Sequence, residues 1–388
     1  MLIDHPGAAS AGGATYLDAA SSEPLHPAAR DALLAAADRA YADPRRGHRA
    51  AREARLVLDN ARAVTAQCLG VRPDEVTFTP SGTHATHLGV LGLLRGRARA
   101  GDRLVVSTVE HSAVLHAARW HDDGGGTLRT VGVDRLGRVS PAELLAAASE
   151  DGPAAAVALQ SANHEVGTLQ PVAEVAAGLG EVPLFVDACA SAGRLPLPDG
   201  WAVAAASAHK WGGPAGVGVL LVRKGARWRA PYPVDERTEE RATGFENVAG
   251  ALAAAAALQA VVEEQEQTAV RQHAMVARVR EAVARIPDVD VVGDPDDRLP
   301  HLLTFSCLYL DGEALVTELD RLGFAVASGS ACTSSTLEPS HVLAAMGALT
   351  HGNVRLSLTR DTRTEDVDRF LDVLPGVVTR LRAEAGVR

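Results

Sequence analysis

Residues 201–222 read WAVAAASAHKWGGPAGVGVLLV, two short apolar runs separated by a polar turn and a glycine-rich stretch. Each run is long enough for a buried strand, and the first ends at Ser207. Lys210 follows that strand end among small residues. There a lysine is desolvated yet accessible to a carbonyl compound, and desolvation lowers the pKa of an ammonium group, as Schiff-base chemistry requires. A solvated charge at a strand end explains the same letters, so the interpretation depends on the rest of the chain.

Similar apolar runs recur upstream and alternate with helical patterns. We expect strands over 75–78, 103–107, 155–159, 184–187, 202–207 and 217–222. We expect helices over 28–41, 49–68, 83–94, 112–120, 141–148 and 172–179. Near-continuous apolar strands joined through helices are typical of a largely parallel sheet with helices on both faces. The predicted fold class is therefore α/β, and such sheets bind ligands at the carboxyl ends of their strands.

The pattern changes after residue 233. A charged stretch over 235–241 precedes a helical pattern that we expect to run from about 246 to 286. Shorter strand and helix patterns follow from residue 302 onward. This change indicates a smaller α+β carboxyl-terminal domain.

The composition disfavours several classes of protein. The 388 residues are 47% hydrophobic and 22% charged, so the chain buries a core, and its net charge of -10 disfavours a nucleic-acid-holding protein. Its four cysteines form no CxxC pair and no zinc-type cluster with histidine, so we expect no metal site, no disulfide framework and a reducing, cytoplasmic setting. We expect no signal peptide, and the most apolar run, 248–262, is shorter than a bilayer span.

Polar loops follow several predicted strands. Residues 79–83, TPSGT, open a helix, and the free N–H groups around Gly82 and Thr83 attract a phosphate, although a plain N-cap turn has the same residues. His111 follows the next strand and suits ring stacking or proton transfer, or a simple loop hydrogen bond. Asn163 follows another strand, where its amide suits a ring oxygen or an ordinary turn.

Asp187 ends the apolar run LFVD. Burying a carboxylate is costly unless a cation pairs with it. The protonated pyridine nitrogen of pyridoxal phosphate is such a cation, and enzymes with that cofactor combine this aspartate with a lysine Schiff base. Asp187, the potential phosphate donors Ser207 and His209, and Lys210 together favour a pyridoxal phosphate site.

Cys332 lies in SGSACTSSTLEPS, residues 328–340, a run of glycine and hydroxyl residues that favours an exposed loop. Cys68, Cys189 and Cys307 have apolar neighbours and fit the usual role of a small buried hydrophobic residue. An accessible cysteine is a candidate nucleophile when a neighbour lowers its pKa. Cys332 is therefore the candidate among the four.

With these motifs the chain resembles the cysteine desulfurases, pyridoxal phosphate enzymes of class V and fold-type I. The resemblance runs from residue 16 to about 374. Its motifs, in matching order, are Glu110-His111, Asn163-x-Glu165-Val166-Gly167, Asp187-Ala188, the segment 207–210, the segment 328–343 and Val354-Arg355-Leu356-Ser357. It implies a large cofactor-binding domain over 16–255 and a small α+β domain, made of 1–15 and 256–388, that carries the Cys332 loop.

The resemblance also implies how the cofactor, pyridoxal 5'-phosphate, is held. Lys210 would form the Schiff base and move the Cα proton of the substrate. Asp187 would pair with the pyridinium nitrogen, and His111 would stack on the ring. The residues that would bind the phosphate are Gly82, Thr83, Ser207 and His209.

For the substrate, the resemblance implies three further roles. Asn163 would lie near the substrate or the ring oxygen, and Arg355 would clamp the α-carboxylate in a bidentate fork. Cys332 would take the sulfur of L-cysteine as a persulfide, leave L-alanine, and pass the sulfur to an acceptor protein.

Several positions depart from the family pattern. The residues after the phosphate loop are His84-Ala85-Thr86-His87, and Ala190 stands where the family has a glutamine that contacts the ring oxygen. Before the long helix, Gly244-Phe245 replaces a Gly-Thr pair and leaves Thr243 as a nearby substitute. Each loss removes one hydrogen bond, of about 1 kcal/mol net.

We therefore expect a homodimeric, cytoplasmic cysteine desulfurase that supplies persulfide sulfur to iron–sulfur clusters, tRNA thiolation or a specialised pathway, with no direct contact to nucleic acid or membrane. One alternative is another enzyme on this fold, namely a selenocysteine lyase, another C–S lyase or an aminotransferase. The other is a degraded desulfurase that acts as a scaffold in a sulfur-transfer complex, which the altered residues at 84–87, 190 and 245 support.

Overall fold

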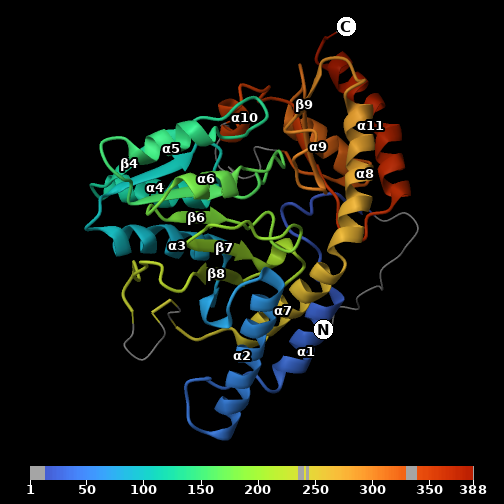
Figure 1. Cartoon of the computed structure of the whole chain (residues 1–388). Helices are drawn as coiled ribbons and strands as arrows, with labels where there is room; N and C mark the ends of the chain where they lie inside the picture. Colours follow the sequence, from blue (N-terminus) through green and yellow to red (C-terminus); the bar gives the residue numbers. More distant parts are fainter. Residues whose placement is uncertain (1–13, 235–239, 242–243, 329–338, 388) are drawn as a thin grey trace.

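The computed structural model describes residues 14–234, 240–241, 244–328 and 339–387. Its largest element is a seven-stranded sheet (Figure 1). In sheet order the strands are β2 (Val76–Thr79), β8 (Gly218–Val222), β7 (Val203–Ser207), β6 (Leu184–Asp187), β5 (Ala156–Gln160), β3 (Arg103–Ser107) and β4 (Thr127–Val131). Strands β7, β6, β5, β3 and β4 are mutually parallel, and β8 lies antiparallel between β7 and β2. The predicted largely parallel sheet is confirmed.

Helices cover both faces of this sheet. They are α1 (Pro27–Ala37), α2 (Arg49–Leu69), α3 (Gly82–Arg97), α4 (Ser112–Asp123), α5 (Pro141–Ser149), α6 (Val172–Gly178) and α7 (Val248–Glu263). Successive side chains of a strand point to opposite faces. Along β6, Leu184 and Val186 pack into the cluster that contains α2 and α7, while Phe185 packs into the cluster that contains α3 and α4. Burial on both faces is the reason that these strands read as continuous apolar runs.

One strand of this sheet, β4, is absent from the sequence-based prediction. Its segment TLRTV lies at the sheet edge, and only Val131 is fully buried. An edge strand of this kind lacks the continuous apolar run that identifies a central strand. The six strands that were predicted begin and end within one residue of their expected limits.

A second, smaller core is built mainly from the carboxyl-terminal part of the chain. It contains the antiparallel sheet β9 (Val289–Val292), β10 (Leu302–Cys307) and β12 (Asn353–Ser357), with helices α8 (Gln265–Val283), α9 (Gly312–Arg321) and α11 (Thr364–Glu384). The short helix α10 (His341–Ala345) packs instead in a separate small cluster with Val109 and Val166. The amino-terminal β1 (Thr15–Tyr16) pairs with β11 (Phe324–Ala325), and Leu17 packs into this second core. Among the described residues, no helix combines the length and apolar character needed to span a membrane.

The single helical pattern expected over 246–286 is in fact two helices, α7 and α8, which meet at Glu264. Helix α7 is alanine-rich and contributes Leu258 to the first core, whereas Met275 and Val283 of α8 belong to the second. The continuous pattern hid the point at which the chain passes from one core to the other.

Candidate active site

A cavity of about 310 Å³ lies at the carboxyl ends of β5, β6 and β7, whose last residues Gln160, Asp187 and Ser207 all line it. The other lining residues are Ser21, Ser81, Gly82, Thr83, Thr86, His111, Ala113, Ala162, His164, Cys189, Ala190, His209, Lys210 and Arg355. The cavity therefore collects most of the site residues predicted from the sequence, from segments that span more than 300 positions of the chain.

One end of the cavity is the amino-terminus of α3. Ser81 caps this helix by accepting a hydrogen bond from the His84 N–H at 3.0 Å, and Gly82 and Thr83 form its first turn. A Cβ on Gly82 would lie 2.6 Å from the Cβ of Ser207, so only glycine lets the helix approach β7 this closely. Free N–H groups, the helix dipole and nearby hydroxyl groups suit a phosphate.

Ser207 and His209 complete this end. The Ser207 hydroxyl and Nδ1 of His209 are 3.0 Å apart. Burial and the nearby Lys210 ammonium lower the pKa of His209 to about 4, so its ring is neutral at pH 7. A neutral His209 can donate one hydrogen bond to a phosphate while it interacts with Ser207.

Asp187 is the last residue of β6 and lines the cavity, and only 5% of its surface is exposed to solvent. Its Oδ1 accepts a hydrogen bond from the Cys189 N–H at 2.9 Å. A buried carboxylate of this kind requires a cationic partner. The protonated ring nitrogen of pyridoxal phosphate supplies one, so the donor set fits that cofactor.

Lys210 lies in a short 3-10 turn (Ala208–Lys210) directly after β7. Its Nζ donates to the carbonyl oxygen of Ser21 at 3.0 Å and to that of Ala20 at 2.5 Å. The amino-terminal loop around Ser21 thus forms a wall of the cavity, although it is about 190 residues distant in sequence. Lys210 therefore faces a pocket rather than bulk solvent.

His111 caps α4, and its Nδ1 accepts a hydrogen bond from the Ala113 N–H at 3.1 Å. Burial, followed by the positive charges of neighbours that include His164 and Lys210, lowers the pKa of His111 to about 3. The ring is therefore neutral, as stacking on a cofactor ring requires. His164 lies edge-on to it, with 4.8 Å between the ring centroids.

Arg355 enters the cavity from β12 and is 4% exposed. Its Nη2 donates to Asp18 Oδ1 at 3.0 Å and to the Ser21 hydroxyl at 2.5 Å, and its Nη1 donates to the His164 carbonyl at 3.2 Å. Its buried Nε has no hydrogen-bond partner among the residues that the structure describes. The unsatisfied Nε–H suits an incoming carboxylate.

Among the predicted residues that the structure describes, Asn163 is not on the cavity wall. Asn163 is fully buried behind it, where its amide donates to the Val109 carbonyl at 3.1 Å and accepts from the N–H groups of Glu165 and Val166. Asn163 therefore shapes the loop that carries His164. Cys332, like Thr243, lies outside the described residues.

The expectation that Cys189 packs as a small hydrophobic residue is confirmed, because its side chain packs against the core that contains α3 and α4. The structure adds that Cys189 also lines the cavity beside Asp187. Burial and the neighbouring Asp187 carboxylate raise the pKa of this thiol well above its usual value. The Cys189 thiol is therefore neutral at pH 7. In the sequence, its position two residues after Asp187, which ends a strand, could have indicated that Cys189 lies at the cavity.

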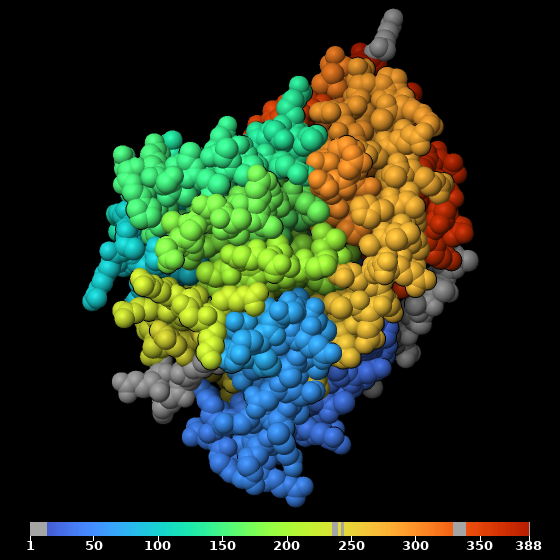
Figure 2. All heavy atoms as spheres, in the orientation of Figure 1, coloured from blue at the N-terminus to red at the C-terminus, as the bar shows by residue number. Residues whose placement is uncertain are grey.

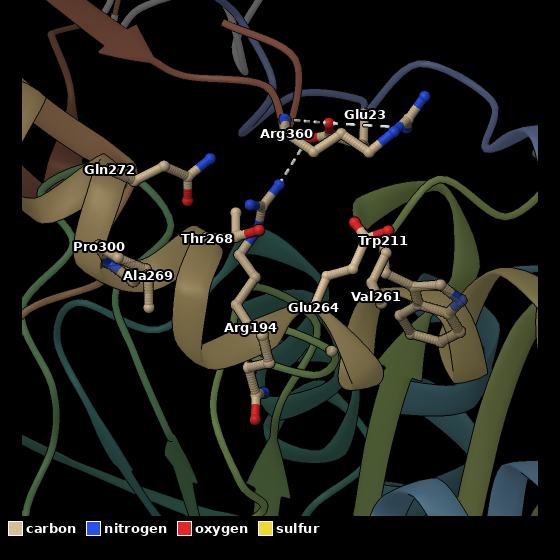
Figure 3. Close-up of a pocket in the computed structure, with 12 residues that line it drawn as sticks. Glu23, Arg194, Trp211, Val261, Glu264, Thr268, Ala269, Gln272, Pro300 and Arg360 are labelled. Atoms are coloured by element: carbon tan, nitrogen blue, oxygen red, sulfur yellow. Dashed lines mark hydrogen bonds and ion pairs between the residues drawn. The ribbon is translucent and has the colours of Figure 1, made fainter.

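Glu23, Arg194 and Arg360 form a buried ion network (Figure 3). The Glu23 carboxylate accepts a hydrogen bond from Arg194 at 2.7 Å and another from the Arg360 N–H at 2.9 Å. Arg194 also donates to the Lys210 carbonyl at 3.3 Å, and the Glu23 N–H donates to the His209 carbonyl at 2.9 Å. The network ties the amino-terminal loop and the end of β12 to the backbone around Lys210.

The chain matches known proteins over almost its whole length. The sequence profile of the family described as "Aminotransferase class-V" matches residues 15–370. The IscS-like cysteine desulfurase of Mycobacterium tuberculosis is 37% identical over 386 residues, covering 95% of this chain and 98% of the relative. The cysteine desulfurase IscS of Dictyoglomus turgidum is 33% identical over 380 residues, covering 95% of each chain.

Solved structures agree with these sequence matches. A structure titled "NIFS-LIKE PROTEIN" superposes with a TM-score of 0.87 at 26% identity, covering 95% of this chain and 100% of the other. The apo structure of cysteine desulfurase from Thermococcus onnurineus superposes with a TM-score of 0.83 at 23% identity, covering 95% of both chains, which supports the fold.

Proposed function

The chain belongs to the class-V aminotransferase family, and within it to the cysteine desulfurases, and we propose that its cavity binds pyridoxal 5'-phosphate and desulfurates L-cysteine. The net reaction converts L-cysteine and the Cys332 thiol into L-alanine and a Cys332 persulfide. No external oxidant or reductant is required, because the two electrons that the sulfur loses in becoming a persulfide are gained by the substrate Cβ, which becomes the methyl group of L-alanine.

The cofactor site follows from the cavity walls. The amino-terminus of α3 with Thr83, together with Ser207 and His209, binds the phosphate. Asp187 pairs with the ring nitrogen, and the neutral His111 ring stacks on the cofactor. When bound, pyridoxal phosphate withdraws electrons from the substrate Cα and weakens the bonds around it.

The main support for the proposal is that Lys210 and Arg355 both form hydrogen bonds with Ser21. Nζ of Lys210 contacts the Ser21 carbonyl at 3.0 Å, and Nη2 of Arg355 contacts the Ser21 hydroxyl at 2.5 Å. An amino acid whose carboxylate binds Arg355 therefore places its Cα near the lysine amine. Lys210 anchors the cofactor and afterwards accepts and returns the Cα proton at Nζ.

Cys332 receives the sulfur and passes it to an acceptor protein. Support for this role comes from the sequence around it, because the segment 328–343 resembles the desulfurase loop that carries the persulfide-forming cysteine. The iron–sulfur, tRNA-thiolation and pathway-specific destinations of that sulfur stay predictions, as does a cytoplasmic location.

A homodimer and a two-domain division are further parts of the proposal. Leu34, Tyr41 and Leu56 are each at least 66% exposed on or beside α1 and α2, which project from the body of the molecule (Figure 2, blue) and offer apolar area to a second copy. The two hydrophobic cores support two domains, but Leu17 belongs to the second core and Leu258 to the first. The boundaries therefore lie after residue 17 and near Glu264, not at the predicted limits of 16–255 and 1–15 with 256–388.

A product assay tests the proposed function. Purified protein saturated with pyridoxal phosphate is incubated with L-cysteine and a thiol reductant, and alanine, sulfide, pyruvate and ammonia are measured. We expect equal amounts of alanine and sulfide, and no turnover in Lys210→Ala or Cys332→Ala protein. Pyruvate with ammonia would indicate a different C–S lyase, and an unchanged alanine rate in Cys332→Ala protein would contradict the persulfide role.

A further inference from the structure

One edge of the seven-stranded sheet is open to solvent. The strand at this edge is β4, which pairs with β3 on one side (Figure 1). Among the described residues, no strand and no isolated bridge pairs with its other side. The strand at the opposite edge, β2, is buried along its whole length, whereas four of the five residues of β4 are not buried. An exposed strand edge is a template for a further strand.

The register of β4 shows which of its backbone groups face outward. The Thr127 N–H and the Val131 carbonyl both form hydrogen bonds with residues that flank β3. Every second residue of a parallel strand bonds to the same neighbour, so the backbone of Arg129 also faces β3. The N–H and C=O groups of Leu128 and Thr130 therefore point away from the sheet. The strand also lacks the proline or lysine that commonly protects such an edge.

A groove of about 630 Å³ lies between β4 and α5. Four consecutive residues, 129–132, line its β4 side, although alternate side chains of a strand point to opposite faces. The groove therefore reaches the outer backbone edge of β4. On the α5 side the small residues Ala146, Ala147 and Ser149 leave it wide. It shares no lining residue with the candidate active site, and β3 separates β4 from β5, so the two are distinct.

The groove carries an excess of negative charge. Its lining contains two carboxylates, Glu143 and Glu150, and one guanidinium, Arg129. Arg129 and Glu150 form an ion pair at 3.4 Å, with side chains that are 55% and 51% exposed, and a pair this exposed is easily exchanged for another. Among the described residues, the exposed Glu143 forms no ion pair. A basic side chain is therefore the charge that complements the groove.

A second copy of this chain fits the edge poorly. An antiparallel copy of β4 that used both outward-facing residues, Leu128 and Thr130, would place Arg129 directly opposite its own counterpart. Like charges directly opposite each other destabilise a strand pair. A segment of different sequence, with no arginine at that position, avoids this repulsion.

We propose that β4 and α5 form a docking site for an extended, basic segment of a partner protein, which adds a strand to the sheet. Its backbone bonds to the outward groups of Leu128 and Thr130, and its lysine or arginine side chains lie over Ala146 with their charged ends at Glu143 and Glu150. Its alternate side chains contact Leu128, which packs against the core that contains α3 and α4. This surface is separate from the desulfurase site and does not depend on that activity.

The probe is an end-blocked, fluorophore-labelled peptide, Thr-Lys-Val-Lys-Val-Lys-Thr, in which lysine and valine alternate as the two faces of the added strand require. Binding to the cofactor-saturated, full-length protein is measured by fluorescence anisotropy at low and at physiological salt. Two companion peptides are used. One is methylated on its backbone nitrogens and cannot pair as a strand, and the other has glutamate in place of lysine.

Three protein variants accompany the peptides. Ala146→Arg fills the groove and reverses its charge. Thr130→Pro removes one outward N–H group, a change that an edge strand tolerates. Ala142→Arg is the matched control, because Ala142 is also exposed on α5 and adds the same charge but does not line the groove.

We expect the lysine peptide to bind the wild-type protein with a micromolar dissociation constant that rises with salt. Ala146→Arg, Thr130→Pro and both companion peptides should each weaken binding by about tenfold or more, through lost hydrogen bonds or lost charge contacts. Ala142→Arg should stay within about twofold of wild type. Cofactor absorbance and thermal unfolding report whether each variant is folded. Ala146→Arg and the methylated peptide test the inference even without Thr130→Pro.

Three results overturn the inference. One is the absence of binding by the lysine peptide at millimolar protein. Another is equal affinity for Ala146→Arg and wild type, or for the methylated and unmethylated peptides, which unspecific charge attraction would give. The third is a wild-type molar mass in solution that falls in Ala146→Arg and Thr130→Pro protein, because the edge would then be occupied by a second copy of the chain.

Discussion

Replacing Glu23 with alanine is expected to lower the free energy of unfolding much more than breaking an exposed ion pair does. The Glu23 and Arg194 side chains are 3% and 11% exposed and lie 2.7 Å apart. Removing the carboxylate leaves Arg194 buried without its partner and removes the acceptor for the Arg360 N–H. Breaking a buried pair from one side costs about 3–5 kcal/mol, because the remaining charge stays desolvated. We expect the free energy of unfolding to fall by this amount.

Urea denaturation followed by tryptophan fluorescence is a suitable assay, because Trp211 lines the same hollow as Glu23 (Figure 3). Glu53→Ala is the matched control. Its partner Arg49 lies at a similar distance, 2.8 Å, but the two side chains are 89% and 48% exposed. Solvent screens such a pair, so the control should unfold at the wild-type urea concentration.

The two ion pairs have similar N–O distances but differ in exposure, so comparing the two variants measures the effect of burial alone. A Glu23→Ala protein that unfolds within about 0.5 kcal/mol of wild type, as an ordinary surface substitution does, would refute the reasoning. The same variant should also lose cofactor affinity, since Arg194 and the Glu23 N–H hold the backbone of Lys210 and His209.

Two further predictions concern cavity residues, and a third concerns Glu110, which is buried and accepts a hydrogen bond from the Gln160 N–H. Gly82→Ala places a Cβ 2.6 Å from Ser207 Cβ, and this overpacking, of about 1–3 kcal/mol, should weaken cofactor binding by about tenfold or more in an absorbance titration. Arg355→Lys loses the planar fork, so the KM for L-cysteine should rise about tenfold or more while the affinity for the cofactor alone changes little. Burial raises the pKa of Glu110 to about 8, so the folded chain retains a proton between pH 4.5 and 8 and loses stability as the pH rises through that window. Glu110→Gln, which mimics the protonated acid, should match wild type near pH 5 and be the more stable protein at pH 8 in thermal unfolding; equal pH profiles would contradict this.

The sheet could be predicted from the sequence because its strands are buried on both faces. Each therefore reads as an apolar run bounded by polar residues, as in Leu184–Asp187. The edge strand Thr127–Val131 gave no such run, and the junction of α7 and α8 at Glu264 has no glycine or proline to indicate it. The pattern of apolar residues along the sequence indicates which segments are buried. It failed to indicate the edge strand, which is only partly buried, and the α7–α8 junction, where the chain passes from one core to the other.

Much of the site could also be predicted, since Asp187, Lys210 and His111 follow strands whose ends must meet. Residues that reach the cavity through tertiary contacts were missed. Ser21 arrives there because β1 pairs with β11 and the following loop returns over the sheet, which no local pattern indicates. His164 stood beside Asn163 in a motif that was recognised, but only the structure shows which of the two side chains faces the cavity.

The proposed function requires that sulfur leaves L-cysteine in this cavity and is received by Cys332. The most direct test is a single turnover with one equivalent of L-cysteine and no reductant, followed by alanine measurement and mass spectrometry of the digested protein. We predict one alanine per site and the mass of one added sulfur atom on the peptide that contains Cys332, with neither product in Lys210→Ala protein. Alanine formed without sulfur on Cys332, or sulfur found on Cys189 instead, would contradict the account.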